Sequence, residues 1–167
     1  LEMTDYVASI KLAQDSDTSY DSELGKKFSK VSKQMTEHLR CWAVTSLSAK
    51  GRVPFEPGYF DYVIIDEASQ CDIASIIPLL FRAKKAVIIG DPKQLSHIAR
   101  IPKKQDFSLL KRFNLPERWS YSVNSLYDLA AGLVNEDNIV SLKDHFRSCS
   151  EIIDFSNNTF YGGSLRT

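Results

Sequence analysis

Residues 62–70 of this chain read Tyr-Val-Ile-Ile-Asp-Glu-Ala-Ser-Gln, an apolar run that ends in two adjacent carboxylates. A short apolar run without polar alternation is typical of a strand that is covered on both faces of a parallel sheet. In open parallel sheets, ligands bind beyond the carboxyl ends of the strands, so we expect Asp66 and Glu67 where chemistry occurs. The alternative interpretation is that the two acids only cap the following helix.

A second apolar run ends in a polar loop at residues 87–95, which read Val-Ile-Ile-Gly-Asp-Pro-Lys-Gln-Leu. Between the two runs, residues 73–80 carry apolar side chains at helical spacing, and Pro78 predicts a kink or a break in that helix. Strand, crossover helix and strand form a βαβ unit, whose parallel strands end at the same sheet edge. The Gln94 amide, which can both donate and accept hydrogen bonds, is therefore expected beside the two acids. The alternative is a Gly-Asp-Pro turn without a function.

The rest of the chain predicts further strands and helices. We expect strands at 41–47 and 139–142, helices within 106–135 with an irregular stretch near 114–120, and a helix over 151–161 that stops at a glycine pair. Residues 1–38 are polar, and Val31, Met35 and Leu39 suit one face of a helix. We interpret that part as a helical appendage or an insertion between core elements.

Composition limits the class of protein. The chain has 167 residues, of which 43% are hydrophobic and 25% charged, as in an ordinary soluble domain. Lys plus Arg and Asp plus Glu number 21 each, so the global charge gives no hint of nucleic acid. Three cysteines without metal-ligand spacing predict buried thiols in a reducing, cytoplasmic compartment, and the three histidines show no ligand spacing either. No apolar run is long enough to predict a membrane span.

Three ordered segments resemble the motifs of superfamily 1 helicases. Residues 66–70 and 90–95 look like motifs II and III, most closely those of the 5′-to-3′ branch that includes the nonsense-mediated-decay RNA helicase. Residues 142–148, Leu-Lys-Asp-His-Phe-Arg-Ser, with the Phe-Tyr-Gly-Gly at 160–163, are similar to motif IV. Residues 41–46 look like the short motif Ic strand. The resemblance covers residues 39–167.

The resemblance implies an α/β fold. Residues 39–137 would form the C-terminal part of a first RecA-like P-loop NTPase domain, with a parallel sheet and flanking helices. Residues 138–167 would begin a second RecA-like domain, with ATP bound between the two domains of the complete protein, and residues 1–38 would remain an appendage.

The resemblance also implies an ATP-dependent helicase that uses Mg²⁺ and moves on single-stranded DNA or RNA. Asp66 would position Mg²⁺, partly through water, and Glu67 would activate the attacking water. Gln94 would couple the γ-phosphate to the nucleic-acid track, and Arg147 would neutralise the charge that develops during the reaction. The resemblance further assigns Gln70, Asp91 and Phe146 to the nucleotide, with Phe146 stacking on the base, and Thr45 and Ser46 to the nucleic-acid backbone.

One departure from the family pattern is the phosphate-binding loop. No Gly-x-x-x-x-Gly-Lys-Ser/Thr sequence occurs in the chain. We expect that the chain is an excised internal piece, inactive toward ATP alone, which works with the remainder of a helicase; its oligomeric state is open. One alternative is a scaffold or effector-recruiting module whose motor has decayed. Another is a non-helicase P-loop ATPase with the same acid pair, against which Arg147 argues.

Overall fold

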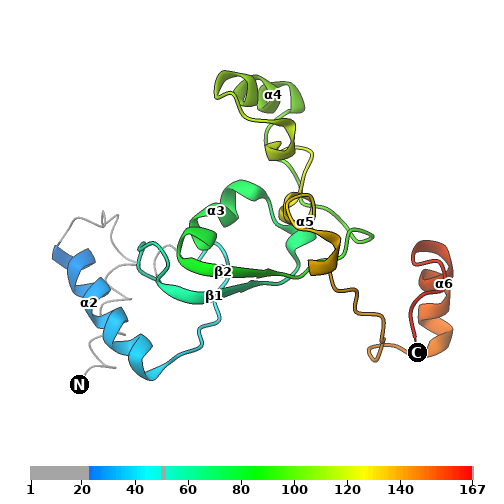
Figure 1. Cartoon of the computed structure of the whole chain (residues 1–167), viewed down its shortest axis with the longest axis horizontal. Coiled ribbons are helices and arrows are strands. Elements are labelled where there is room, and N and C mark those ends of the chain that lie inside the picture. The colour runs from blue at the N-terminus through cyan, green and yellow to red at the C-terminus, as the bar shows by residue number, and fades with distance from the viewer. Residues whose placement is uncertain (1–22, 50–51, 167) are drawn as a thin grey trace. The chain divides into compact units, whose positions relative to one another are not determined.

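The computed structural model describes residues 23–49 and 52–166, which contain short helices and two strands (Figure 1). In chain order these are α2 (Glu23–His38), β1 (Phe60–Ile65), η2 (Ala68–Gln70), α3 (Ile73–Phe81), β2 (Ala83–Ile88), α4 (Lys103–Arg112), η3 (Glu117–Trp119), α5 (Leu126–Ala131), η4 (Glu136–Asn138) and α6 (Ser150–Phe160). The chain divides into two compact units, residues 1–65 with 74–87, and residues 66–73 with 88–167. The domain boundaries at residues 38 and 137 stay a prediction.

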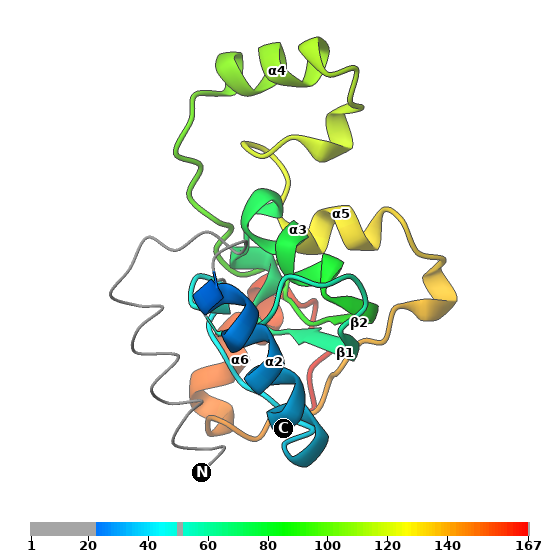
Figure 2. The same cartoon turned by 90° about the vertical axis from the view of Figure 1, so that its left-hand side faces the viewer.

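β1 and β2 pair in one sheet and run in the same direction (Figures 1 and 2). Near the start of the strands, the Phe60 amide donates to the Arg82 carbonyl at 2.8 Å, and beyond their ends the Ala68 amide donates to the Ile89 carbonyl at 2.8 Å. The partner's number rises along both strands, as only a parallel pair allows. Because α3 connects the strands, the predicted βαβ unit and the α/β, partial RecA-like fold class are confirmed.

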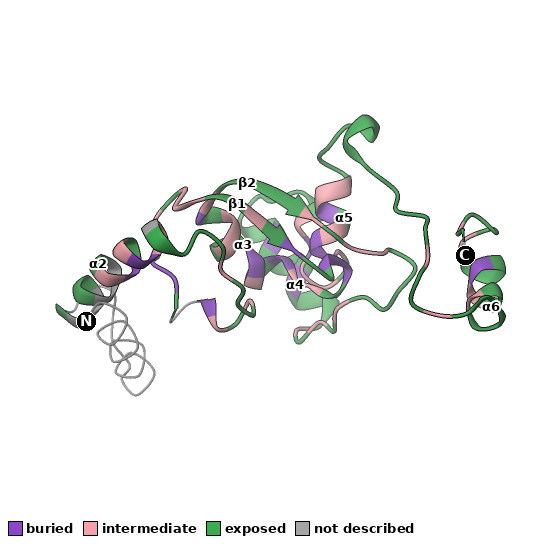
Figure 3. Cartoon of the chain, turned by 90° about the horizontal axis from the view of Figure 1, so that it is seen from below, coloured by how far each residue is buried: buried purple, intermediate pink, exposed green. Residues whose placement is uncertain are grey.

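Only one face of β1 is covered in the part of the chain that the structure describes (Figure 3). Ile65 is buried and Val63 half-buried, whereas Tyr62 and Ile64 remain 58% and 67% exposed. Successive side chains of a strand point to opposite faces, so this alternation separates a packed face from an open one. The expectation of cover on both faces is wrong here, because one crossover helix supplies a single covering layer.

The helix between the strands is continuous, so the predicted break at Pro78 does not occur. α3 runs from Ile73 to Phe81 with Pro78 inside it. Proline removes the hydrogen bond that the Ala74 carbonyl would accept. Ala74 and Pro78 are both exposed, so water can satisfy that carbonyl. Ile73 and Ile76 are 3% and 1% exposed, which confirms the first part of the predicted apolar stripe, whereas Ile77 is 46% exposed and so does not belong to the buried face.

A buried arginine joins the end of α3 to the segment before β1. Arg82 is 4% exposed and donates from Nε to the Pro54 carbonyl at 3.0 Å and from Nη1 to the Pro78 carbonyl at 2.6 Å. Its guanidinium also lies over the Phe55 ring, 4.7 Å from the ring centroid. These carbonyls compensate a charge whose burial would otherwise be costly.

Two predicted strands are absent from the described residues. Residues 41–47 and 139–142 pair with no other strand there. Leu47, Val140 and Leu142 are 82%, 80% and 84% exposed. An apolar run becomes a strand only when a neighbour supplies backbone partners and a covering layer. Within the described residues, β1 and β2 pair only with each other, so these runs have no such neighbour.

The polar N-terminal region contains the expected helix. α2 begins at Glu23, and the part of the prediction that concerns residues 1–22 lies outside the described residues. Met35 is 4% exposed, with Val31 and Trp42 packed against it, so Trp42 belongs to a small apolar cluster. Leu39 lies beyond the end of the helix and is 46% exposed, which corrects the expectation that it completes the helix face.

The helices predicted after β2 are confirmed, as is the irregular stretch between them. Asp106 of α4 is buried and accepts hydrogen bonds from Ser120 at 2.6 Å and from the hydroxyl of Ser122 at 2.7 Å, which ties the helix to that stretch. Tyr121 packs edge-on against His97. None of the described helices is long and apolar enough to cross a membrane.

Candidate active site

The acids after β1 lie in a sharply turned loop. Glu67 has φ 55° and ψ 38°, a left-handed conformation that costs a residue with a Cβ about 1–2 kcal/mol. The Glu67 amide donates to Asp66 Oδ1 at 3.0 Å, and Gln70 Nε2 donates to Glu67 Oε2 at 3.2 Å. Both carboxylates are exposed and oriented by neighbouring amides. Strain of this kind is often found at functional sites, where the surrounding contacts hold it in place.

Backbone and side-chain hydrogen bonds join this loop to the loop after β2. The Ala68 amide donates to the Ile89 carbonyl at 2.8 Å, and the Asp91 amide donates to Ser69 Oγ at 3.3 Å. Ser69 is 4% exposed, so the second bond is shielded from water. The loops that carry the acids and Gln94 therefore emerge at the same end of the parallel strands, as the βαβ spacing predicts.

Gly90 permits the close approach of the two loops. A Cβ atom at this position would lie 3.0 Å from the Ser69 amide nitrogen and 2.9 Å from Cδ2 of Tyr127, whose ring packs over the glycine. Because the Ser69 contact is to backbone, a larger residue could not be accommodated by a side-chain rotation alone. The requirement for glycine thus arises from tertiary packing, since no unusual φ is involved.

Asp91 is the hydrogen-bond centre of the second loop. Its Oδ1 accepts from the Lys93 amide at 2.9 Å, and its Oδ2 accepts from Gln94 Nε2 at 3.0 Å and from the Tyr161 hydroxyl at 2.5 Å. Burial would raise the pKa of Asp91, but these hydrogen bonds and the charge of Lys93 lower it below its ordinary value. The same hydrogen bond to Asp91, with burial, raises the pKa of Tyr161 to about 12. Neither Ser69 nor Tyr161 was assigned a role from the sequence.

α5 supports the first loop from behind. The Leu126 amide donates to the Cys71 carbonyl at 2.9 Å, and the Leu126 side chain is only 2% exposed. Ser125 caps the helix: its hydroxyl accepts from the Asp128 amide, and the Asp128 carboxylate accepts from the Ser125 amide at 2.9 Å. The Ser-x-x-Asp spacing before an apolar run is the sequence signal that could have identified this support.

The segment that resembles motif IV carries its two predicted residues on the surface. Phe146 is 93% exposed, and Arg147 is exposed as well. In the described part of the chain, no hydrogen bond or ion pair joins Arg147 to Glu67 or Gln94. The structure therefore brings the first three predicted catalytic residues onto adjoining loops, and among the described residues no hydrogen bond or ion pair joins Arg147 to them.

Thr45 and Ser46, predicted to contact the nucleic-acid backbone, lie in a turn. Thr45 Oγ1 donates to Ser48 Oγ at 2.9 Å, and the Ser48 amide donates to the Thr45 carbonyl at 3.1 Å. The hydroxyls thus start a loop, although the strand expected before them is absent. Their role in binding stays a prediction.

The donor set at the end of β1 suits a magnesium ion that keeps most of its water. No group of three or more His, Cys, Asp or Glu side chains that could enclose a metal occurs among the described residues. Mg²⁺ usually binds one or two carboxylates together with water and phosphate oxygens, so the exposed carboxylate of Asp66 fits such an ion.

The thiol of the nearby Cys71 is a poor nucleophile, because burial and the charges of Asp72 and Glu67 raise its pKa. Cys41 and Cys149 are exposed, contrary to the expectation of buried thiols.

A βαβ unit whose two parallel strands end in polar loops gives this chain a partial RecA-like α/β fold. The sequence profile of a family described as "AAA domain" matches residues 4–98, and the chain belongs to that family. The helicase resemblance is confirmed as well, because the relatives found by sequence comparison are named as helicases.

One of these relatives is MG140 of Mycoplasma genitalium, named as an uncharacterized ATP-dependent helicase. It is 35% identical over 142 residues, which cover 84% of this chain and 12% of the relative. Human senataxin, named as a probable helicase, is 28% identical over 146 residues, which cover 80% of this chain and 5% of the relative. Helicase SEN1 of Saccharomyces cerevisiae is 57% identical over 37 residues, or 22% of this chain and 2% of the relative. The chain thus spans a small part of the length of these relatives.

Proposed function

We propose that this chain forms part of an ATP-dependent helicase or translocase of superfamily 1, which couples ATP hydrolysis to movement on single-stranded DNA or RNA. The observation that carries this proposal is the joining of the two loops beyond β1 and β2. Through the bonds from Ala68 to Ile89 and from Asp91 to Ser69, an acid pair and a glutamine share one sheet edge. The names of the relatives support the same activity.

Each loop residue has a chemical task in this proposal. Asp66, whose Oδ1 accepts from the Glu67 amide, would hold Mg²⁺, partly through water. Glu67, oriented by Gln70, removes a proton from the attacking water. Gln94, held by Asp91, reports the state of the terminal phosphate to the rest of the loop. ATP and Mg²⁺ supply the phosphoanhydride bond and charge neutralisation when they are bound.

The remaining assignments concern the nucleotide, the nucleic acid and the compartment. Gln70, Asp91 and the exposed ring of Phe146 belong to nucleotide binding, in the case of Asp91 through the loop that it organises. Arg147 neutralises the developing charge, and Thr45 and Ser46 contact the nucleic-acid backbone. The proposed compartment is the cytoplasm.

The test is Glu67→Gln in the complete protein, measured as Mg²⁺-dependent phosphate release with and without single-stranded DNA or RNA. The change keeps the size of the side chain and removes its basicity, so the rate should fall by at least about 100-fold. Binding of a fluorescent ATP analogue should persist, because the proposed role of Glu67 is to activate water and does not include binding the nucleotide.

Glu136→Gln is the matched control. Glu136 opens η4 and is exposed, and its carboxylate has no hydrogen bond or ion pair with the two loops in the described part of the chain, so its variant should keep the parental rate. Near-normal turnover of Glu67→Gln would remove Glu67 from the mechanism. A complete protein that binds nucleic acid but releases no phosphate would instead favour the decayed-motor alternative.

A further inference from the structure

The Tyr161 hydroxyl reaches a loop seventy positions earlier in the chain. It donates to Asp91 Oδ2 at 2.5 Å, on the same oxygen that accepts from Gln94 Nε2 at 3.0 Å. Hydrogen bonds to an ionised acceptor are among the stronger ones in proteins. A carboxylate held by several donors has few orientations left, so Tyr161 restricts the group that in turn holds Gln94.

Tyr161 is itself fixed by the end of α6. Its amide donates to the Asn157 carbonyl at 3.1 Å, and the Gly163 amide donates to the same carbonyl at 3.0 Å. Asn157 is only 8% exposed, and its side chain exchanges two hydrogen bonds with the backbone of Leu165, at 3.1 and 3.0 Å. Gly162 and Gly163 adopt positive φ values of 59° and 72°, which the turn after the helix needs.

Backbone hydrogen bonds attach the end of this turn to the segment that carries Arg147. The Arg166 amide donates to the Lys143 carbonyl at 2.8 Å, and the His145 amide donates to the Arg166 carbonyl at 2.8 Å. The guanidinium of Arg166 also pairs with Asp144, with a distance of 2.8 Å between Nε and Oδ1. Residues 143–145 are therefore bound to Arg166, at the end of the turn that begins with Tyr161.

We propose that Tyr161 is a positioning residue that fastens Asp91, and through it Gln94, to the helix end that also anchors the Arg147 segment. A displacement of the loop at 90–94 then also displaces the turn after α6, and a displacement of the turn also displaces the loop. This inference rests on the proposed function for the meaning of Gln94, whereas the contact itself does not. Contiguous hydrogen-bonded chains of this kind can carry coupling between distant groups.

Tyr161→Phe in the complete protein tests the contact, because it removes the hydroxyl and keeps the ring. Tyr127→Phe is the matched control: its ring packs over Gly90, and its hydroxyl has no hydrogen bond in the described part of the chain. The readout is hydrogen–deuterium exchange, by mass spectrometry, of a peptide that covers residues 91–95. Exchange of the Lys93 amide should be roughly 2- to 30-fold faster in Tyr161→Phe than in the control.

Unchanged exchange in Tyr161→Phe, or equal acceleration in both variants, would overturn the proposal. Exchange in α5 serves as the check that neither variant loosens the fold as a whole. The exchange result does not depend on ATPase activity, so it stands even if Glu67→Gln shows the proposed function to be wrong.

A double-mutant cycle separates positioning from a general structural effect. If Tyr161 acts through Gln94, Tyr161→Phe should lower nucleic-acid-stimulated phosphate release by roughly 2- to 30-fold in the parental protein. It should add no further loss in a Gln94→Ala background. Independent, multiplying losses in the double variant would contradict the route through Gln94.

Discussion

The loops at 66–70 and 90–94 and the segment at 142–148 carry the same kind of resemblance to helicase motifs, yet their surroundings in the structure differ. The two loops are joined by bonds such as that from Asp91 to Ser69, and buried residues of α5 support them. In the segment, Leu142 is 84% and Phe146 is 93% exposed, and the backbone of Lys143 and His145 is hydrogen-bonded to Arg166 after α6.

The difference shows what a motif needs beyond its own residues. The first two segments follow strands that pair with each other, so each supplies the other with a neighbour. Residues 139–142 are also mainly apolar, with Ser141 as the exception, but no described strand pairs with them. A strand in a parallel sheet gains most of its stability from such neighbours, so the same local pattern gives a strand in one place and an exposed loop in the other.

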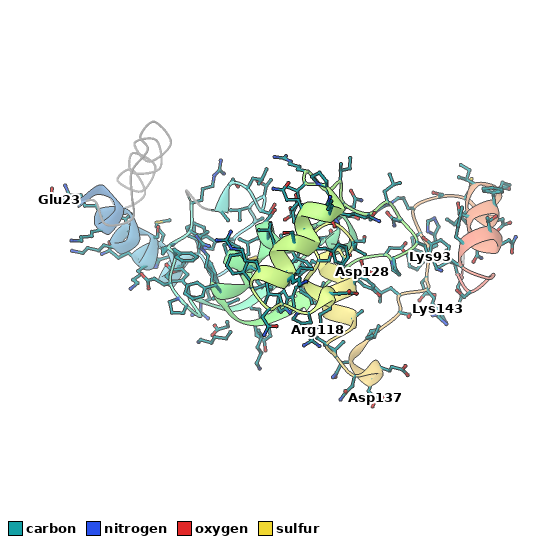
Figure 4. All side chains as sticks on the ribbon, turned by 90° about the horizontal axis from the view of Figure 1, so that it is seen from above. Glu23, Lys93, Arg118, Asp128, Asp137 and Lys143 are labelled. Carbon is teal, nitrogen blue, oxygen red and sulfur yellow. The ribbon has the colours of Figure 1, made fainter. Side chains whose placement is uncertain are left out.

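The largest expected effect comes from Arg147→Ala in the complete protein. If the exposed guanidinium neutralises charge during hydrolysis, the rate of phosphate release should fall by about 10³- to 10⁵-fold. Lys143→Ala is the control, since Lys143 is also an exposed cation of the same segment (Figure 4). Equal, small losses in the two variants would mean that the segment acts only as a positively charged surface.

Gly90→Ala should break the joined loops. Its Cβ would meet the Ser69 backbone at 3.0 Å and Tyr127 at 2.9 Å, so we expect a loss of about 1–3 kcal/mol in the free energy of unfolding. Gly132→Ala is the control, because the nearest atom to its Cβ would be the Asp128 carbonyl oxygen at 3.4 Å. Urea denaturation followed by fluorescence measures both, and a neutral Gly90→Ala would show that the loops can separate without cost.

Ser125→Ala should weaken the support behind the first loop. The hydroxyl accepts from the Asp128 amide and donates to the Asp128 carboxylate at 2.7 Å, so its removal should cost about 1 kcal/mol of unfolding free energy. Asn135 precedes η4 without a side-chain cap hydrogen bond, and Asn135→Ala should therefore change stability less. The same urea titration compares them, and equal losses would remove the capping box as the cause.

The sequence predicted the parts of the fold that local pattern determines. The helices α3 and α6, the run at 62–65 and the shared edge of Asp66 and Gln94 follow from periodicity and from the geometry of a βαβ unit. The stop of α6 follows from a glycine pair. The continuity of α3 through Pro78 could not be predicted, because it depends on the exposure of the Ala74 carbonyl.

The parts that depend on distant partners could not be predicted from the sequence. In the sequence, Ser69 is a common loop residue, and only the structure shows that its hydroxyl accepts from the Asp91 amide at 3.3 Å. In the sequence, Tyr161 is an aromatic residue after a helix with nothing to mark it, and only the structure shows that its hydroxyl donates to Asp91. The roles of Asp66, Glu67 and Gln94 remain proposals, because chemistry requires the reacting groups as well as the loops that surround them.

The smallest expected effect is that of Leu142→Gln, which tests the comparison from its other side. Leu142 is 84% exposed, so in residues 1–167 the change should alter the free energy of unfolding by less than about 0.5 kcal/mol. Ile76→Ala, at a position 1% exposed, should cost about 2–5 kcal/mol in the same urea titration. A cost for Leu142→Gln that approached that of Ile76→Ala would mean that residues 139–142 do pack as a strand. If the cost arose only in the complete protein, residues outside this chain would supply the missing neighbour, and the exposed run would be an unpaired strand of a larger sheet.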